Sequence, residues 1–158
     1  MQFPYGAVYF RKSNPPREDW ERDYRTAAED GLNIFRHWVM WSAIEIAPGV
    51  YDWEEYDRQL DLAAENGIKT IIAEMLTIPE WLAASEPDLL YQKMDGTRCR
   101  SHIGVSSATG GFNAGPCLDN PKGKEYAERF LRALAERYKD HPALLGYDVW
   151  NECNYPED

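Results

Sequence analysis

The sequence predicts an α/β fold in which short apolar strands alternate with amphipathic helices. Four apolar runs of strand length occur along the chain, and a segment with helical spacing separates each run from the next. Residues 27–32 recur almost unchanged as residues 63–68, an offset of 36 residues, which is about one strand–helix unit. Parallel strands need crossover helices of this kind. The predicted architecture is therefore a (β/α)8 barrel of which only about the first four strands are present.

The first strand is predicted at residues 6–10, and a helix follows a polar loop that contains two adjacent prolines. This helix ends at Gly31, because glycine takes the left-handed conformation without strain. The second strand is predicted at residues 33–37 and runs into residues 38–41, before a loop at 42–49. Apolar side chains recur on one face of the helix, at Trp20, Tyr24, Ala27 and Ala28.

A second helix is predicted to begin near Trp53 and to end at Gly67. The third strand, residues 69–74, is an apolar run of the kind found in strands covered on both faces. Residues 75–119 show no long helical period, and a loop of such length in a compact domain is usually functional. We therefore expect an insertion over the rim of the barrel, with a short helix around residues 80–84.

The third long helix is predicted to begin at Asn120, which caps it ahead of a proline, and the fourth strand lies at residues 144–150. A complete eightfold barrel takes about 250 residues. We therefore interpret residues 1–158 as one truncated domain, the N-terminal half of a barrel. An open parallel sheet of four strands would leave an exposed edge strand and an uncovered apolar face.

Composition excludes several classes of partner. The net charge of −10 argues against nucleic acid and anionic membranes, because both require a basic face. No apolar run approaches the ~20 residues of a membrane span, and the N-terminus lacks the features of a signal peptide. Three widely spaced cysteines without a secretion signal indicate reduced thiols and a cytoplasmic protein. The aromatic content of 13% suits either core packing or stacking on sugar rings.

Glu152 is the first candidate for chemistry. It follows the fourth strand directly, at the rim where barrels of this type carry their active sites. A carboxyl group near an apolar ring such as that of Trp150 can hold its proton near neutral pH and act as a general acid. Asn151 beside it can fix a substrate hydroxyl. A polar strand terminus followed by a loop is the alternative interpretation of the same residues.

The chain also resembles a known group of enzymes. Trp150-Asn151-Glu152 at the end of a fourth strand resembles the signature of the clan A glycoside hydrolases, which are retaining enzymes built on eightfold barrels. Residues 33–36 resemble the end of that clan's second strand, and residues 41–45 with 48–53 resemble the loop after it. Segments that resemble glycoside hydrolase family 42, the β-galactosidases, occur in order at residues 79–83, 95–96, 125–127, 134–138 and 141–144.

This resemblance implies roles for individual residues. Glu152 would be the general acid/base in the hydrolysis of terminal β-D-galactosides, and Asn151 would bind the 2-hydroxyl of the cleaved sugar. Arg36 would hold the active-site carboxylates in place. Trp150 would join the substrate-binding residues, and Arg100, in the loop after the third strand, is a candidate for contact with the terminal sugar. The implied substrate is a β-galactoside or a related oligosaccharide.

The resemblance also raises expectations about metal and assembly. Some family members bind a structural zinc ion through cysteines in the loops after strands three and four. Cys117 and Cys153 are the corresponding candidates here, although the full ligand set is absent; no other cofactor is expected. Trimeric assembly is common in the family, so a homo-oligomer is expected on that ground alone.

One half of the chemistry is missing from the sequence. A retaining glycosidase needs a nucleophile about 5–5.5 Å from its acid/base, and the resemblance places that residue on a seventh strand. Glu45 and Glu74 are the only internal substitutes. We therefore predict that the isolated chain lacks turnover. The alternatives are a non-catalytic carbohydrate-binding or assembly module, and another clan A activity such as β-mannanase or endoglucanase.

Overall fold

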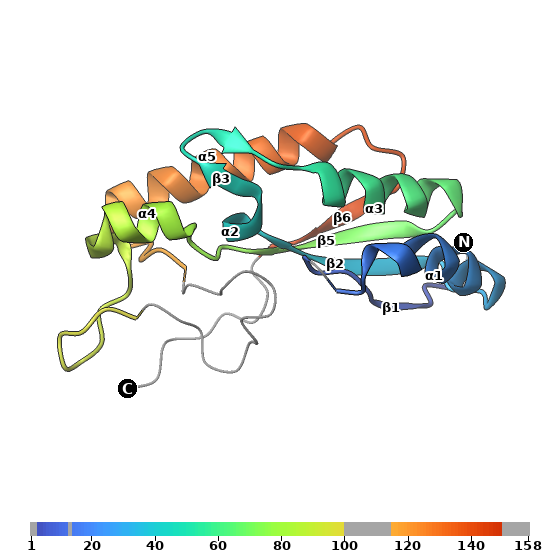
Figure 1. The fold of residues 1–158 in the computed structure, drawn as a ribbon, viewed down its shortest axis with the longest axis horizontal. Helices are drawn as coiled ribbons and strands as arrows, with labels where there is room; N and C mark the ends of the chain where they lie inside the picture. The colour runs from blue at the N-terminus through green and yellow to red at the C-terminus, as the bar shows by residue number, and fades with distance from the viewer. Residues whose placement is uncertain (1–2, 13, 100–114, 150–158) are drawn as a thin grey trace.

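A computed structural model describes residues 3–12, 14–99 and 115–149 (Figure 1). Its main feature is a parallel sheet in the order β1-β2-β5-β6, which confirms the predicted α/β class and the alternation of strands with helices. All four predicted strands are present, although the ends differ by a few residues. Their bounds are β1 (Gly6–Val8), β2 (Ile34–Met40), β5 (Lys69–Met75) and β6 (Leu144–Asp148).

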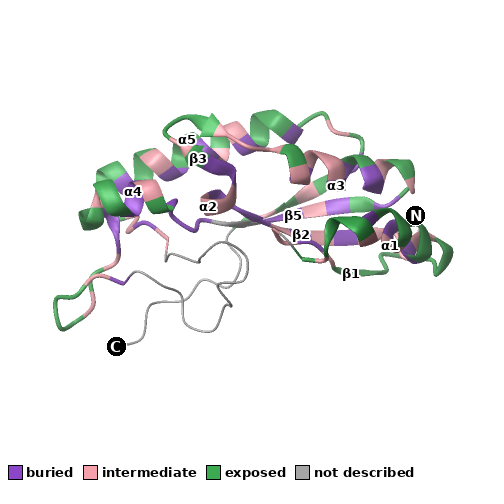
Figure 2. Ribbon diagram, viewed as in Figure 1, coloured by how far each residue is buried: buried purple, intermediate pink, exposed green. Residues whose placement is uncertain are grey.

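Three long helices lie side by side along one face of this sheet: α1 (Trp20–Glu29), α3 (Glu54–Glu65) and α5 (Pro121–Tyr138). An ion pair of 2.9 Å between Arg58 and Glu21 joins α3 to α1. The ring of Trp53, which precedes α3, stacks on Phe130 of α5 at a centroid distance of 6.3 Å. Figure 2 shows buried residues along the strands and exposed residues on the outer side of α5. None of the helices in the described ranges is long and apolar enough to cross a bilayer.

The repeated sequence at the ends of α1 and α3 forms the same structure twice. Gly31 and Gly67 both have positive φ, at 85° and 70°. At the first end, the N–H of Leu32 donates to the carbonyl oxygen of Ala27 at 2.9 Å; at the second, Ile68 donates to Ala63 at 2.8 Å. These bonds satisfy carbonyl groups that a helix end leaves unpaired. The repeat is therefore a helix stop, as the sequence predicted.

The prediction of a loop at residues 42–49 is wrong in detail. The structure has a single helical turn there, α2 (Trp41–Ile44), followed by an antiparallel hairpin of β3 (Glu45–Ala47) and β4 (Val50–Tyr51). The hairpin turns at Gly49, where φ is 72°. These elements are too short for hydrophobic periodicity to reveal, because their conformation depends on the side-chain contacts of one buried residue, described below.

The predicted short helix in the long segment is confirmed as α4 (Glu80–Ser85). A 3₁₀ turn, η2 (Pro87–Leu89), follows it, and the chain then forms two isolated bridges, between Leu90 and Pro116 and between Gln92 and Arg98. The central part of the predicted insertion lies outside the described residues.

Both edges of the sheet are open within the described part of the chain. On β6, which pairs only with β5, Leu145 is 52% exposed and Tyr147 is 39% exposed. Val149, directly after the strand, is 71% exposed. On the opposite edge, Val8 of β1 is also exposed. The exposed edge and uncovered apolar side chains that the sequence predicted are therefore present.

A buried histidine lies between the sheet and the helices. His37 of β2 is fully enclosed, and its Nε2 lies 3.2 Å from the hydroxyl of Tyr24, which donates to Gln59 at 2.9 Å. Burial lowers the pKa of His37 to about 3, because the charged imidazolium would lose its hydration. The ring is therefore neutral at physiological pH and is enclosed too deeply to serve as a catalytic base.

This histidine predicts a pH-dependent stability. The pKa of His37 in the folded chain is below the unfolded value of about 6.5, so protonation favours the unfolded state. Its contribution is fully present above pH 6.5 and is lost as the pH falls toward 3. Between pH 7 and pH 5 we expect the free energy of unfolding to fall by about 2 kcal/mol more than in His37→Leu. Urea denaturation at both pH values checks this; equal changes in the two proteins would contradict it.

Candidate functional site

The carboxyl ends of the four strands meet at one edge of the sheet, where parallel α/β folds carry their active sites. Helix α2, which follows β2, and the loop after β5 are joined there by hydroxyl groups. Ser42 Oγ of α2 lies 2.8 Å from Thr77 Oγ1, and the backbone N–H of Ser42 donates to the same oxygen at 3.2 Å. The two segments are thereby held against each other at the rim.

Alternate residues of the strands point away from the helices and form an inner face. Phe35 contacts Tyr24 of α1, with ring centroids 5.1 Å apart, so the side chain of Phe35 points toward the helices. Arg36, its neighbour on β2, therefore points to the opposite face of the sheet. Within the register of the sheet, Arg36 lies opposite Ile71, and Trp38 lies opposite Ala73.

Arg36 makes an ion pair with Asp148 across this inner face. Its Nε and Nη2 both donate to Oδ2 of Asp148, at 3.0 and 2.6 Å. Asp148 lies opposite Ala73, so the side chain of Arg36 crosses the intervening strand β5 to reach it. Both side chains are partly exposed. The inner face thus carries a charged pair that links Arg36, the third residue of β2, to Asp148, the last residue of β6.

The predicted role of Arg36 is tested only in part by this pair. One carboxylate that Arg36 contacts belongs to Asp148, and the contacts with the active-site carboxylates that the resemblance implies stay a prediction. Trp150, Asn151 and Glu152 lie outside the described residues, and so does Arg100. Their roles stay predictions. The strand that leads to the first three is described, and Asp148 precedes Glu152 by four positions.

Glu45 is a structural carboxylate, and its suggested role as a substitute nucleophile is wrong. The side chain is completely buried. Oε2 accepts from the indole of Trp41 at 2.6 Å, and Oε1 accepts from the backbone N–H of Gly49 at 2.8 Å and from Arg129 of α5 at 2.5 Å. Because three donors and full burial enclose the carboxylate, it is inaccessible to a sugar. It instead fixes the hairpin β3–β4 against α5.

The second suggested substitute, Glu74, is the next-to-last residue of β5. Its side chain lies outside the described part of the structure, and its suggested role stays a prediction.

Zinc was expected from Cys117 and Cys153. Cys117 is partly buried and forms no disulfide among the described residues, and Cys153 lies outside them. In the described ranges, no group of three or more His, Cys, Asp or Glu side chains converges as a structural zinc site requires. Because Cys153 lies outside the described residues, the expected structural zinc site stays a prediction.

Most aromatic side chains that the structure describes serve packing. Trp20, Trp41, Tyr56 and Tyr138 are all buried in the core, which supports the core-packing interpretation for these residues. Trp38 differs, because it lies on the inner face and is partly exposed, with the guanidinium of Arg11 5.7 Å from its ring centre. Its position on this face would allow its ring to contact a ligand.

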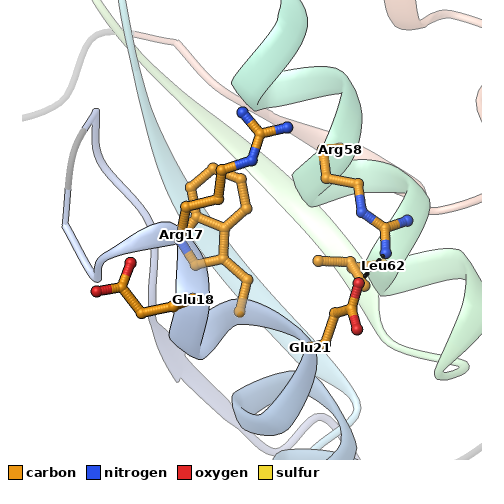
Figure 3. Close-up of a pocket in the computed structure, with 6 residues that line it drawn as sticks. Arg17, Glu18, Glu21, Arg58 and Leu62 are labelled. Atoms are coloured by element: carbon orange, nitrogen blue, oxygen red, sulfur yellow. Dashed lines mark hydrogen bonds and ion pairs between the residues drawn. The ribbon is translucent and has the colours of Figure 1, made fainter.

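A hollow of about 320 Å³ lies in the helical layer, away from the inner face (Figure 3). It is lined by Arg17 and Glu18 of the 3₁₀ turn η1 (Arg17–Asp19), by residues of α1 and by Arg58 and Leu62 of α3. The two arginines are already paired with carboxylates: Arg17 with Glu54 and Arg58 with Glu21. Because both arginines already pair with carboxylates, we do not assign a second binding site to this hollow.

Asp148 is a site residue that the sequence interpretation missed. The fourth strand was recognised, but the charged residue inside it was not assigned a partner. A signal was available in the alternation of side chains. Arg36 and Asp148 are charged residues at interior positions of two predicted strands, and opposite charges at such positions suggest a pair on one face of the sheet.

The sequence matches the model of a β-galactosidase family, glycoside hydrolase family 42, over residues 9–158. The β-galactosidase LacZ of Heyndrickxia coagulans is 32% identical over 170 aligned residues, which cover 99% of this chain and 23% of that protein. The β-galactosidase Bga of Halorubrum lacusprofundi is 29% identical over 149 aligned residues, which cover 93% of this chain and 20% of that protein. The chain therefore spans about a fifth of the length of these relatives.

Solved structures agree with the fold. The β-galactosidase from the Antarctic haloarchaeon Halorubrum lacusprofundi superposes with a TM-score of 0.77 at 26% identity, over 94% of this chain and 21% of that one. Gan42B, a family 42 β-galactosidase from G. stearothermophilus, superposes with a TM-score of 0.73 at 26% identity, over 95% of this chain and 21% of that one. The four strands thus correspond to part of a (β/α)8 barrel, as the sequence predicted.

Proposed function

The chain belongs to glycoside hydrolase family 42, the β-galactosidase family, and we propose that it supplies the general acid/base of a retaining β-galactosidase site. The observation that carries the proposal is the extent of the family match, which runs from residue 9 to residue 158 and so includes Trp150-Asn151-Glu152. By family the protein is a glycosidase. The β-galactoside substrate is proposed from the printed names of the relatives.

In the proposed mechanism, Glu152 first donates its proton to the glycosidic oxygen as the bond from that oxygen to the anomeric carbon breaks and the nucleophile bonds to the same carbon. It then accepts a proton from the water that attacks the glycosyl-enzyme intermediate. Asn151 donates to the 2-hydroxyl of the sugar, where a hydrogen bond strengthens as positive charge develops on the ring. Trp150 and Arg100 are proposed contacts of the sugar.

The nucleophile is proposed to lie outside residues 1–158. Retention requires two carboxyl groups about 5–5.5 Å apart, on opposite faces of the glycosidic bond. Glu45 is enclosed by three donors and cannot reach a sugar. The open edges of β1 and β6 would allow further strands to extend the sheet, and such strands could bring the second carboxylate to the rim.

A hybrid enzyme tests this function. In it, the complete chain replaces the matching segment of the Heyndrickxia coagulans β-galactosidase, of which it covers 23%. We expect the hybrid to hydrolyse a chromogenic β-galactoside, because the host supplies the remaining strands. We expect the isolated chain to show no turnover, because it holds one of the two carboxylates. A folded hybrid without activity would contradict the proposed function, and so would strong hydrolysis by the isolated chain.

A further inference from the structure

The ion pair between Arg36 and Asp148 occupies an unusual place. Positions that face the inside of a parallel barrel are normally filled by branched apolar residues. Here the guanidinium of Arg36 donates twice to Asp148 Oδ2, at 3.0 and 2.6 Å, above the inner face of the sheet. A partly exposed charged pair contributes little to stability, because water weakens the attraction and ordering the two side chains costs entropy. Its presence therefore calls for another explanation.

A small residue on the intervening strand makes the pair possible. Arg36 and Asp148 lie on β2 and β6, which are separated by β5. Neighbouring strands are about 4.8 Å apart, so the side chains must meet above β5. Ala73 lies beside this path, since it is the register partner of Asp148, and it is completely buried although it faces inward. A larger side chain at position 73 would occupy the space through which the guanidinium reaches Asp148.

The pair involves the strand that leads to the proposed acid/base. Asp148 is the last residue of β6 and precedes Glu152 by four positions in the sequence. In the register of the sheet, Arg36 lies level with Gly146, two residues before Asp148, and so on the same face as Asp148. A guanidinium held at this point has a fixed position relative to the rim. A free arginine side chain would instead sample many rotamers.

We propose that Asp148 is a positioning residue, which fixes the guanidinium of Arg36 beneath the catalytic rim and so orders the groups that bind the sugar in the transition state. This inference rests on the proposed function, because it assigns Asp148 to the same site. Asp148 acts through Arg36 and does not itself react. Positioning of this kind affects the chemical step more than binding, because small displacements of a charged group lower the rate steeply.

The test uses the hybrid enzyme with single and combined variants. We expect Asp148→Asn to lower kcat about 10- to 100-fold and to change KM by less than about threefold. In Arg36→Met, the further change Asp148→Asn should cost no additional activity, because the residue through which Asp148 acts is already gone. Ala73→Leu keeps every charge but obstructs the path of Arg36, and we expect a loss similar to that of Asp148→Asn.

A matched control removes another carboxylate that pairs with an arginine. Asp57 of α3 pairs with Arg137 of α5 in the helical layer, outside the inner face. We expect Asp57→Asn to leave kcat and KM unchanged. The Nε–H resonance of Arg36 provides a second measurement in the unfused chain. It should be protected from solvent exchange and lose that protection in Asp148→Asn and Ala73→Leu.

The outcomes separate this inference from the proposed function. A folded hybrid without any hydrolysis contradicts the proposed function itself. An active hybrid in which Asp148→Asn keeps full kcat contradicts only the positioning role, as do additive losses in the double variant. An Arg36 Nε–H that exchanges equally fast with and without Asp148 also contradicts it. Loss of kcat at nearly constant KM, together with non-additivity, supports it.

Discussion

Replacing Glu152 by glutamine should lower kcat of the hybrid enzyme about 10²- to 10⁴-fold for a galactoside with a poor leaving group. Glutamine keeps the size of the side chain but has no acidic proton, so the departing oxygen must leave as an unprotonated alkoxide. General acid catalysis accounts for a factor of this size in comparable reactions. The measurement is steady-state hydrolysis of an alkyl β-galactoside by the hybrid and by its Glu152→Gln variant.

The leaving group supplies the control for this prediction. A dinitrophenyl galactoside releases a stable phenolate and needs no proton to depart, so the glycosylation step in Glu152→Gln should be slowed far less. Added azide should further accelerate the variant, because azide attacks the intermediate without help from a general base. Equal losses on both substrates, with no response to azide, would exclude an acid/base role for Glu152.

Replacing Glu45 by alanine should lower the free energy of unfolding by about 3 kcal/mol. The carboxylate accepts from Trp41, from the backbone of Gly49 and from Arg129. Its removal leaves the indole N–H of Trp41, a fully buried residue, without its acceptor, and a buried donor without a partner is costly. The substitution also removes the acceptor of the backbone N–H of Gly49, in the turn of the hairpin. Urea denaturation of the chain and of Glu45→Ala measures the difference.

Glu128 provides the matched control for Glu45. It lies on the exposed side of α5 and pairs with Arg132 one turn later. Pairs of this kind contribute little, so Glu128→Ala should change stability by less than about 0.5 kcal/mol. If both glutamate variants lost the same small amount of stability, the buried carboxylate would not be the anchor of the hairpin.

The main elements of the fold could be predicted because their signals are local. Strands such as β5 are continuous apolar runs, and the helix stops at Gly31 and Gly67 depend on a residue type that tolerates positive φ. The hairpin β3–β4 could not be predicted in this way. Its shape depends on Glu45 meeting Arg129, which lies 84 positions later in the chain, and no local pattern encodes such a contact.

The candidate site shows the same division. Arg36 was predicted as a site residue from its resemblance to a strand end; the structure places it on the inner face, as the third residue of β2, which continues to Met40. Its partner Asp148 is 112 residues away in sequence. The pair depends on the strand order β1-β2-β5-β6, which brings β6 within reach of β2 across β5. Alternation along each strand indicates the face, but only the order of the strands identifies the partner.

We propose that this chain supplies the acid/base and the host segment supplies the nucleophile. Covalent labelling of the hybrid enzyme can test this assignment. A 2-deoxy-2-fluoro-β-galactoside with a good leaving group forms the glycosyl-enzyme but hydrolyses slowly, because fluorine destabilises the positively charged transition state. Digestion and mass spectrometry then locate the labelled residue. We predict that the label lies in the segment contributed by the host and never within residues 1–158. A sugar attached to Glu74 or to any other residue of this chain would contradict the assignment of the nucleophile outside it.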